Sequence, residues 1–305
     1  MNKLKKIKII RFVLIITALV ITIPNISSQQ TKNELSINGG VGLSAFIMQP
    51  TLENVLPNGI IGDIGFGLTF FLHPKWGIYL GAGIGLAQPV AKTNKITILN
   101  SGLTDSNGYL FDLHTNLLYF TEQQSMSFLS VPLMLHYQAM PQGRLSAQHR
   151  GRINFFYAMT GIKFIIPQNS QYRSNTTSLT NAAYYPDMDN WAGTQTFAGL
   201  GTFEGVGSEG DLELDMFVAF SLEAGIKSII NKKMFLYTGL FLDIGLEDPY
   251  QNRRLSYTDQ NAAVLISETS FLNFSDKITF TAVGLKLRLA FTSLKKTQKC
   301  DHWIY

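Results

Sequence analysis

The most regular feature of this chain is an alternation between bulky apolar residues and small or polar ones. In GIYLGAGIGLAQPV, residues 77–90, apolar side chains recur at every second position, and glycine dominates the positions between them. Successive residues of a β-strand point to opposite faces, so this pattern predicts a strand with two different environments. The glycines lie within the strand period with no helical pattern after them, which excludes a dinucleotide-binding loop.

The same period recurs along the chain. Eight segments carry it: 35–47, 63–72, 77–90, 129–138, 156–166, 215–227, 236–247 and 282–291. After residue 28, the sequence has neither a segment of helical period nor a run of 18 apolar residues. We therefore predict an all-β protein with eight strands.

The predicted connections alternate in length. Those at 91–124, 167–212 and 249–275 are long, whereas HPKW (73–76) and NKK (231–233) are short and MPQGRLSAQHRG (140–151) is intermediate. Outer-membrane barrels have an even number of strands, short periplasmic turns and long extracellular loops. The pattern thus places the three long connections outside the cell and the short ones in the periplasm.

The two faces of the strands distinguish a membrane barrel from a soluble one. One face is nearly uncharged in all eight segments, and charged residues make up only 15% of the chain against about 25% in average soluble domains. Lipid requires an apolar outer face and a closed sheet without unpaired edges. We predict an eight-stranded antiparallel up-and-down transmembrane β-barrel, with a secreted β-sandwich or soluble barrel as the alternative.

The first 28 residues have the pattern of a signal peptide. A basic start precedes a short apolar run, Pro24 and small residues. The run is shorter than the ~20 residues of a membrane-spanning helix, although an uncleaved anchor is the alternative. We predict a signal peptide at 1–28, a barrel at 29–292 and a periplasmic tail at 293–305. The leader carries five positive charges, so the remainder has a formal net charge of −1 rather than +4, which predicts no nucleic-acid partner.

The polar face predicts a filled lumen. An eight-stranded barrel is only just wide enough for side chains to fill it. The glycines of the first three strands would then make room for long inward residues from other strands. We expect Glu223 to pair with some of the three inward cations. The predicted interior charge cluster consists of Asp63, Lys163, Glu223, Asp243, Lys286 and Arg288.

The strand rhythm and several short strings resemble the outer-membrane β-barrel family of Bacteroidota, which includes the PorT-type proteins of the type IX secretion system. The best local match is FLSVPLMLHY at 128–137, where the family has an aromatic residue, Ile or Val before Pro, and a leucine-rich run that ends in a basic residue and Tyr. YAMTGIKF and LYTGLFLDIGL are similar to two other strands of the family. The resemblance implies an outer-membrane barrel of the eight-stranded OmpA- and OmpX-like kind. Ser130, where relatives often have an acidic residue, and the long connections depart from the secretion-linked form.

The sequence offers no catalytic arrangement within its strands. Ser130 and His136 share the inward face, but they lie about 20 Å apart along an extended strand. Cys300, Asp301 and His302 cluster in the tail without a second pair of ligands, which argues against a metal site. We predict no enzyme activity, no cofactor and no metal.

Aromatic residues among Asn, Ser, Thr and Gly mark the connection at 171–210 as a candidate contact surface. Alternatively, these aromatics pack on one another or lie at the lipid headgroup level. The loop contact candidates are Tyr172, Tyr184, Tyr185, Trp191 and Phe197. We expect an outer-membrane anchor that has a filled lumen and is surrounded by lipid. Its loops would contact a protein or glycan, or the whole protein would belong to an envelope assembly. A narrow transport channel is the first alternative, and a lipid-modifying barrel enzyme is the second.

Overall fold

The computed structural model describes residues 33–49, 59–105, 107–139, 154–194, 199–231, 233–250, 270, 272, 275 and 277–292. The predicted signal peptide, the connection at 140–151 and the tail at 293–305 lie outside these residues. Among the residues described, no helix has the length and apolar character needed to cross a membrane.

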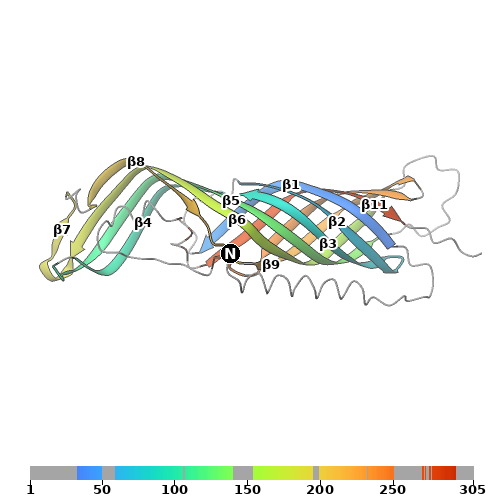
Figure 1. The fold of residues 1–305 in the computed structure, drawn as a ribbon, viewed down its shortest axis with the longest axis horizontal. Helices are drawn as coiled ribbons and strands as arrows, with labels where there is room; N and C mark the ends of the chain where they lie inside the picture. Colours follow the sequence, from blue (N-terminus) through green and yellow to red (C-terminus); the bar gives the residue numbers. More distant parts are fainter. Residues whose placement is uncertain are drawn as a thin grey trace, which may run out of the picture. The chain divides into compact units, whose positions relative to one another are not determined.

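Eight antiparallel strands form a closed sheet (Figure 1). They are β1 (Asn33–Gln49), β2 (Gly59–His73), β3 (Trp76–Gln88), β5 (Leu110–Gln138), β6 (Asn154–Tyr185), β9 (Phe217–Asn231), β10 (Met234–Gly245) and β11 (Lys277–Thr292). Each pairs with the next in this order, and each alternating segment of the sequence falls on one of them, apart from one or two end residues. The predicted eight-stranded antiparallel barrel is confirmed.

The first and last strands close the barrel. β1 pairs with β11 in one unbroken register, from Glu34 opposite Thr292 to Gln49 opposite Lys277. This pairing satisfies the backbone groups of both strands, which would otherwise form exposed sheet edges. The two short turns also lie where the sequence predicts them, at Pro74 and Lys75 between β2 and β3 and between the end of β9 at Asn231 and the start of β10 at Met234.

The long connections predicted at 91–124 and 167–212 are present, but most of their described residues form strands that were not predicted. β5 and β6 continue beyond the barrel, and β4 (Val90–Thr104) and β8 (Gly201–Asp211) pair with their extensions. The short strand β7 (Asn190–Ala192) follows a 3-10 turn, Pro186–Met188, and pairs with the end of β6. We call residues 90–104, 110–125, 169–185 and 201–211 the distal sheet, whose strand order is β4-β5-β6-β8.

The composition of the distal sheet explains why its strands were not predicted. Its strands are rich in Thr, Asn and Ser, and its exposed face carries few aliphatic residues, among them Leu99, Leu110 and Leu118. One side of the sheet still buries apolar residues, among them Leu113, Leu117 and Leu179.

The outer face of the barrel is apolar in every strand. Large aliphatic and aromatic side chains on this face are exposed by up to 64%, a value reached at Leu72. Across β1, β11 and β10, the neighbours Val41, Leu285 and Leu240 are each exposed by 60–63%. A continuous apolar surface of this kind is typical of a barrel whose outside faces hydrocarbon.

The inside of the barrel is filled by buried side chains. One apolar cluster includes Phe46, Phe217, Phe241 and Phe280 in the barrel and continues to Leu179 of the distal sheet. The charged residues occupy the inner face between this cluster and the short turns. The lumen is therefore filled in layers, and its apolar layer was not part of the sequence-based prediction.

Candidate functional site

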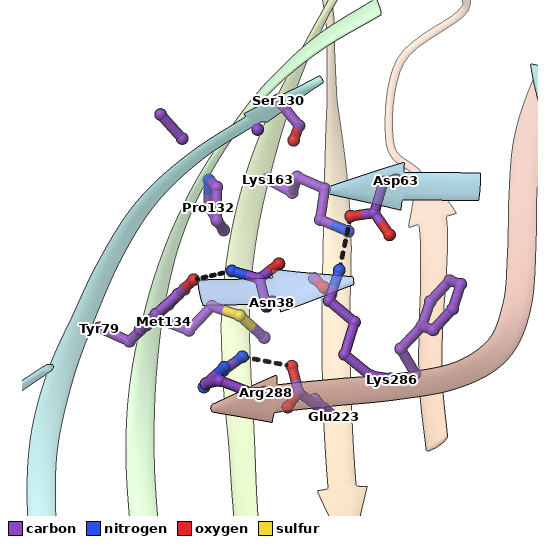
Figure 2. Close-up of a pocket in the computed structure, with 14 residues that line it drawn as sticks. Asn38, Asp63, Tyr79, Ser130, Pro132, Met134, Lys163, Glu223, Lys286 and Arg288 are labelled. Atoms are coloured by element: carbon purple, nitrogen blue, oxygen red, sulfur yellow. Dashed lines mark hydrogen bonds and ion pairs between the residues drawn. The ribbon is translucent and has the colours of Figure 1, made fainter. Parts of the chain in front are cut away.

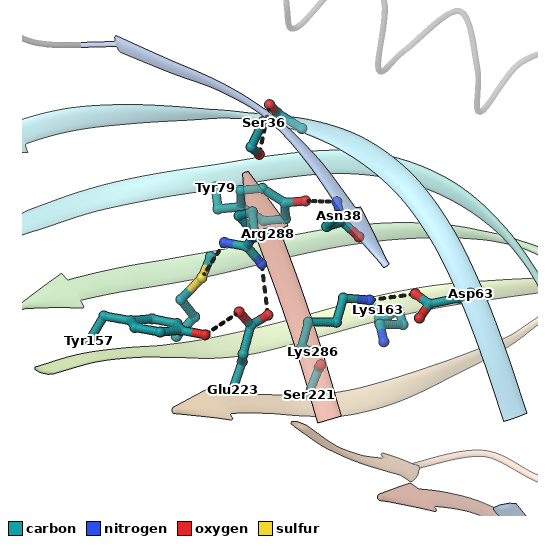
Figure 3. Close-up of polar contacts among 12 residues, drawn as sticks. Ser36, Asn38, Asp63, Tyr79, Tyr157, Lys163, Ser221, Glu223, Lys286 and Arg288 are labelled. Atoms are coloured by element: carbon teal, nitrogen blue, oxygen red, sulfur yellow. Dashed lines mark hydrogen bonds and ion pairs between the residues drawn. The ribbon is translucent and has the colours of Figure 1, made fainter. Parts of the chain in front are cut away.

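The central layer of the lumen is built around the ion pair between Arg288 and Glu223. Nη2 of Arg288 donates to Oε2 of Glu223 at 2.7 Å, and the two side chains are only 2% and 4% exposed. The hydroxyl of Tyr157 donates to the other carboxylate oxygen at 2.9 Å (Figure 3). The guanidinium also lies 4.3 Å from the ring centroid of Tyr79, whose hydroxyl accepts a hydrogen bond from Asn38. β1, β3, β6, β9 and β11 thus meet at this layer.

Two further ion pairs adjoin the central layer on the side of the distal sheet. Nζ of Lys286 lies 2.5 Å from Asp63, and Nζ of Lys163 lies 2.5 Å from Asp243. Ser221 donates a hydrogen bond of 2.6 Å to the second carboxylate oxygen of Asp243. All six charges of the predicted interior cluster therefore lie on the inner face and are joined into three pairs.

Close packing in this layer depends on glycine at particular positions. A Cβ atom at Gly40 would overlap the carboxylate of Asp63 and would lie 3.1 Å from Cδ of Lys286. At Gly67, a Cβ atom would overlap the ring of Tyr79. The inward glycines of the first strands therefore make room for charged pairs and also for aromatic rings.

A second charged layer, which the sequence analysis did not single out, lies nearer the short turns. Lys227 donates hydrogen bonds to Glu34 at 2.7 Å and to Gln138 at 2.9 Å, and the hydroxyl of Tyr237 donates to Glu34 at 2.5 Å. Lys227 is only 1% exposed, and its ammonium lies 4.4 Å from the ring centroid of Phe235. The alternation already assigns Lys227 and Tyr237 to the inward face. Glu34 was missed because it precedes the first apolar residue of its strand.

Ser130 and His136 both point inward and do not form a catalytic pair. Ser130 borders the central layer, whereas His136 packs in the second layer among the rings of Phe71, Tyr157 and Tyr237, at centroid distances of 5.0–6.1 Å. His136 is fully buried. They lie six residues apart on the same strand, β5.

Little free space is left between these layers. Figure 2 shows residues that border a cavity, among them Asp63, Tyr79, Lys163, Glu223 and Arg288. The volume of this cavity is about 20 Å³. A water molecule needs roughly 10–15 Å³ of such space, so the cavity holds one or two waters. The apolar cluster then covers the charged layers on the side of the distal sheet.

The loop contact candidates lie at different levels of the distal sheet. Tyr172 is buried, and its hydroxyl lies 3.3 Å from that of Ser208. Tyr185 packs on Phe111, and its burial and the neighbouring Asp105 raise the pKa of its phenol. The ring of Tyr184 contacts that of Trp191, which is 57% exposed. Phe197 lies outside the described residues.

Tyr184 and Trp191 lie at the end of the distal sheet that is remote from the barrel. β6 pairs with β9 only as far as Ile165, and Tyr184 lies 19 residues further along the same strand. At about 3.3 Å per residue, Tyr184 is on the order of 60 Å along the strand from the end of this pairing. Several of these aromatics pack on one another, as the alternative interpretation expected, and Tyr184 and Trp191 lie far along the strands from the barrel.

No protein-family model and no curated protein sequence matches this chain. Among solved structures, it is similar to the outer membrane protein OprG from Pseudomonas aeruginosa, with 13% identity, a TM-score of 0.36 and coverage of 87% of this chain and 98% of OprG. Neisserial surface protein A (NspA) has 8% identity and a TM-score of 0.32, with coverage of 84% and 97%. Ail of Yersinia pestis has 8% identity and a TM-score of 0.24, with coverage of 86% and 99%.

Proposed function

We propose that this protein is a non-enzymatic outer-membrane β-barrel whose closed lumen acts as a rigid anchor and whose distal sheet makes contacts outside the cell. The lumen carries this proposal. Three ion pairs, a second charged layer and an aromatic cluster fill it, and the described cavity has room for only one or two waters. A barrel of this kind holds its external part in a fixed position without conducting solutes.

The membrane location is supported by the outside of the barrel. Side chains such as Ile37, Ile64 and Leu285 are each at least 60% exposed, although water would disfavour so large an apolar surface. The closed pairing of β1 with β11 removes the sheet edge that hydrocarbon does not tolerate. We assign the short turns to the periplasm and the distal sheet to the cell exterior, as in outer-membrane barrels generally.

The relation to the Bacteroidota outer-membrane barrels is a further part of this proposal. The motif at 128–137 lies on the barrel half of β5, where it pairs with both β3 and β6. Phe128 packs in the apolar cluster, and Pro132 borders the cavity. Membership of a secretion assembly would be tested by purifying the protein from its native envelope and identifying proteins that remain bound in mild detergent.

Conductance in a planar bilayer tests the anchor against a narrow channel. The wild-type protein is expected to insert without a steady ionic current, because the ion pairs and the aromatic layer leave no continuous water path. Phe280→Ala serves as a comparison, because it removes a ring that packs on both Phe46 and Phe217. A steady current through the wild type would refute the anchor and favour the channel.

A further inference from the structure

The exposed face of the distal sheet combines an aromatic cluster with a row of hydroxyl and amide groups. Trp191, on β7, lies 4.8 Å from the ring of His114 and 4.9 Å from the ring of Tyr184. Its ring is held by these two neighbours, yet the side chain is 57% exposed. Because three rings gather here on an exposed face, this cluster is a candidate ligand-binding surface.

The polar row crosses all four strands next to these rings. The register pairs Thr97 with Asn116, Asn116 with Thr180, and Thr180 with Thr202. Thr97 donates to the amide oxygen of Asn116 at 2.8 Å, and the hydroxyls of Thr180 and Thr202 lie 3.1 Å apart. The sheet therefore holds these groups in a fixed line of donors and acceptors that face solvent.

The two features are close enough to act together. Asn116 follows His114 by two residues on the same face of β5, which corresponds to about 7 Å along the strand. This spacing is comparable with the length of a disaccharide. A sugar ring has apolar C–H groups that stack on an aromatic face, while its hydroxyls both donate and accept hydrogen bonds.

The charged residues near the aromatic rings indicate whether a charged or an uncharged sugar would bind. The register places Asp112 opposite Tyr184, and Asp189 accepts a hydrogen bond of 2.8 Å from the hydroxyl of Tyr184. Asp187 lies in the 3-10 turn between β6 and β7. Lys95, two residues before Thr97 on the same face of β4, is an exposed cation next to the polar row. Anionic polysaccharides would meet the three carboxylates beside the aromatic rings, so the charge there favours an uncharged ligand.

We propose that Thr97, His114, Asn116, Thr180, Tyr184 and Trp191 form a binding site for a neutral oligosaccharide. The rings of Trp191 and its two neighbours stack on one sugar unit, and the row of Thr97, Asn116 and Thr180 binds the hydroxyls of the next. This site deepens the proposed function, since it rests on the distal sheet being presented outside the cell by the barrel.

The test uses the full-length protein in lipid nanodiscs and four probes: maltohexaose, cellohexaose, chitohexaose and heparin. Titration calorimetry is expected to detect saturable binding of at least one neutral hexasaccharide and none of heparin. Trp191→Ala should weaken that binding by about tenfold or more, as expected for an exposed aromatic anchor. Thr180→Val should weaken it while leaving the tryptophan emission of the free protein unchanged.

Tyr119→Asn is the matched control. Tyr119 is an aromatic residue of β5 with 65% exposure that lies outside the proposed site, and Asn tolerates its positive φ of 50°. Binding should be unchanged in this variant. Absence of binding to all neutral probes, equal binding of heparin, or unchanged affinity in Trp191→Ala would each overturn the proposal. Conductance of the same nanodisc preparation after transfer to a bilayer reports on the anchor separately, so failure of the glycan site and failure of the closed barrel are distinguishable.

Discussion

Replacement of Glu223 by leucine is the most informative test of the filled lumen. The change leaves Arg288 buried without its carboxylate partner and removes the acceptor of the Tyr157 hydroxyl. Breaking a buried ion pair by removing one partner costs about 3–5 kcal/mol. Both side chains are at most 4% exposed, so solvent screens this loss little. Glu223→Leu should therefore lower the free energy of unfolding by roughly this amount.

Urea unfolding of the protein refolded in lipid vesicles, followed by tryptophan fluorescence, measures this change. Glu209→Leu is the matched control, because Glu209 also pairs with an arginine, Arg173, but the two are 70% and 78% exposed. An exposed pair contributes about 0–1 kcal/mol. The double variant Glu223→Leu with Arg288→Met should recover much of the loss, since an apolar pair can replace a buried ion pair. Equal stability of the two glutamate variants would refute the argument that the lumen pair is buried.

Two other outcomes follow from the membrane-embedded barrel. Leu285→Lys, in the middle of β11, should destabilise the protein in vesicles by about 2–4 kcal/mol, whereas the same change at Leu110 in the distal sheet should have little effect; equal effects in the urea assay would contradict a lipid-facing belt. Proteinase K added to intact cells should cut within 105–109 or 186–200, as detected by mass spectrometry, and cleavage confined to 293–305 would invert the topology.

The sequence alone could predict the barrel because each strand faces two solvents of different polarity. Lipid selects large apolar residues on one face, and the narrow lumen selects small or charged residues on the other. Alternation therefore identified Glu223 and Arg288 as inward residues before their partners were known. It could not pair them, because contacts across the lumen depend on the stagger of the closed sheet, which is not encoded in any one strand.

The distal sheet was harder to predict for a different physical reason. Its exposed face contacts water, so Thr, Asn and Ser replace most of the aliphatic residues that reveal a lipid-facing strand. Trp191 was a candidate from composition, but His114 was not, because their contact joins two strands that are far apart in sequence. The row from Thr97 to Thr202 is likewise visible only once the register of four strands is known.

The closure between β1 and β11 determines when this protein can become native. The hydroxyl of Thr292 donates to the carbonyl of Asn33, 259 positions away, and Glu34 receives hydrogen bonds from residues 193 and 203 positions away. Contacts of such long range form late and slowly, because most of the chain must be ordered before they gain anything. β1 can therefore complete its pairing only after β11 has been synthesised and delivered. Closure of the barrel and formation of the ion pair between Lys227 and Glu34 then occur in one cooperative step.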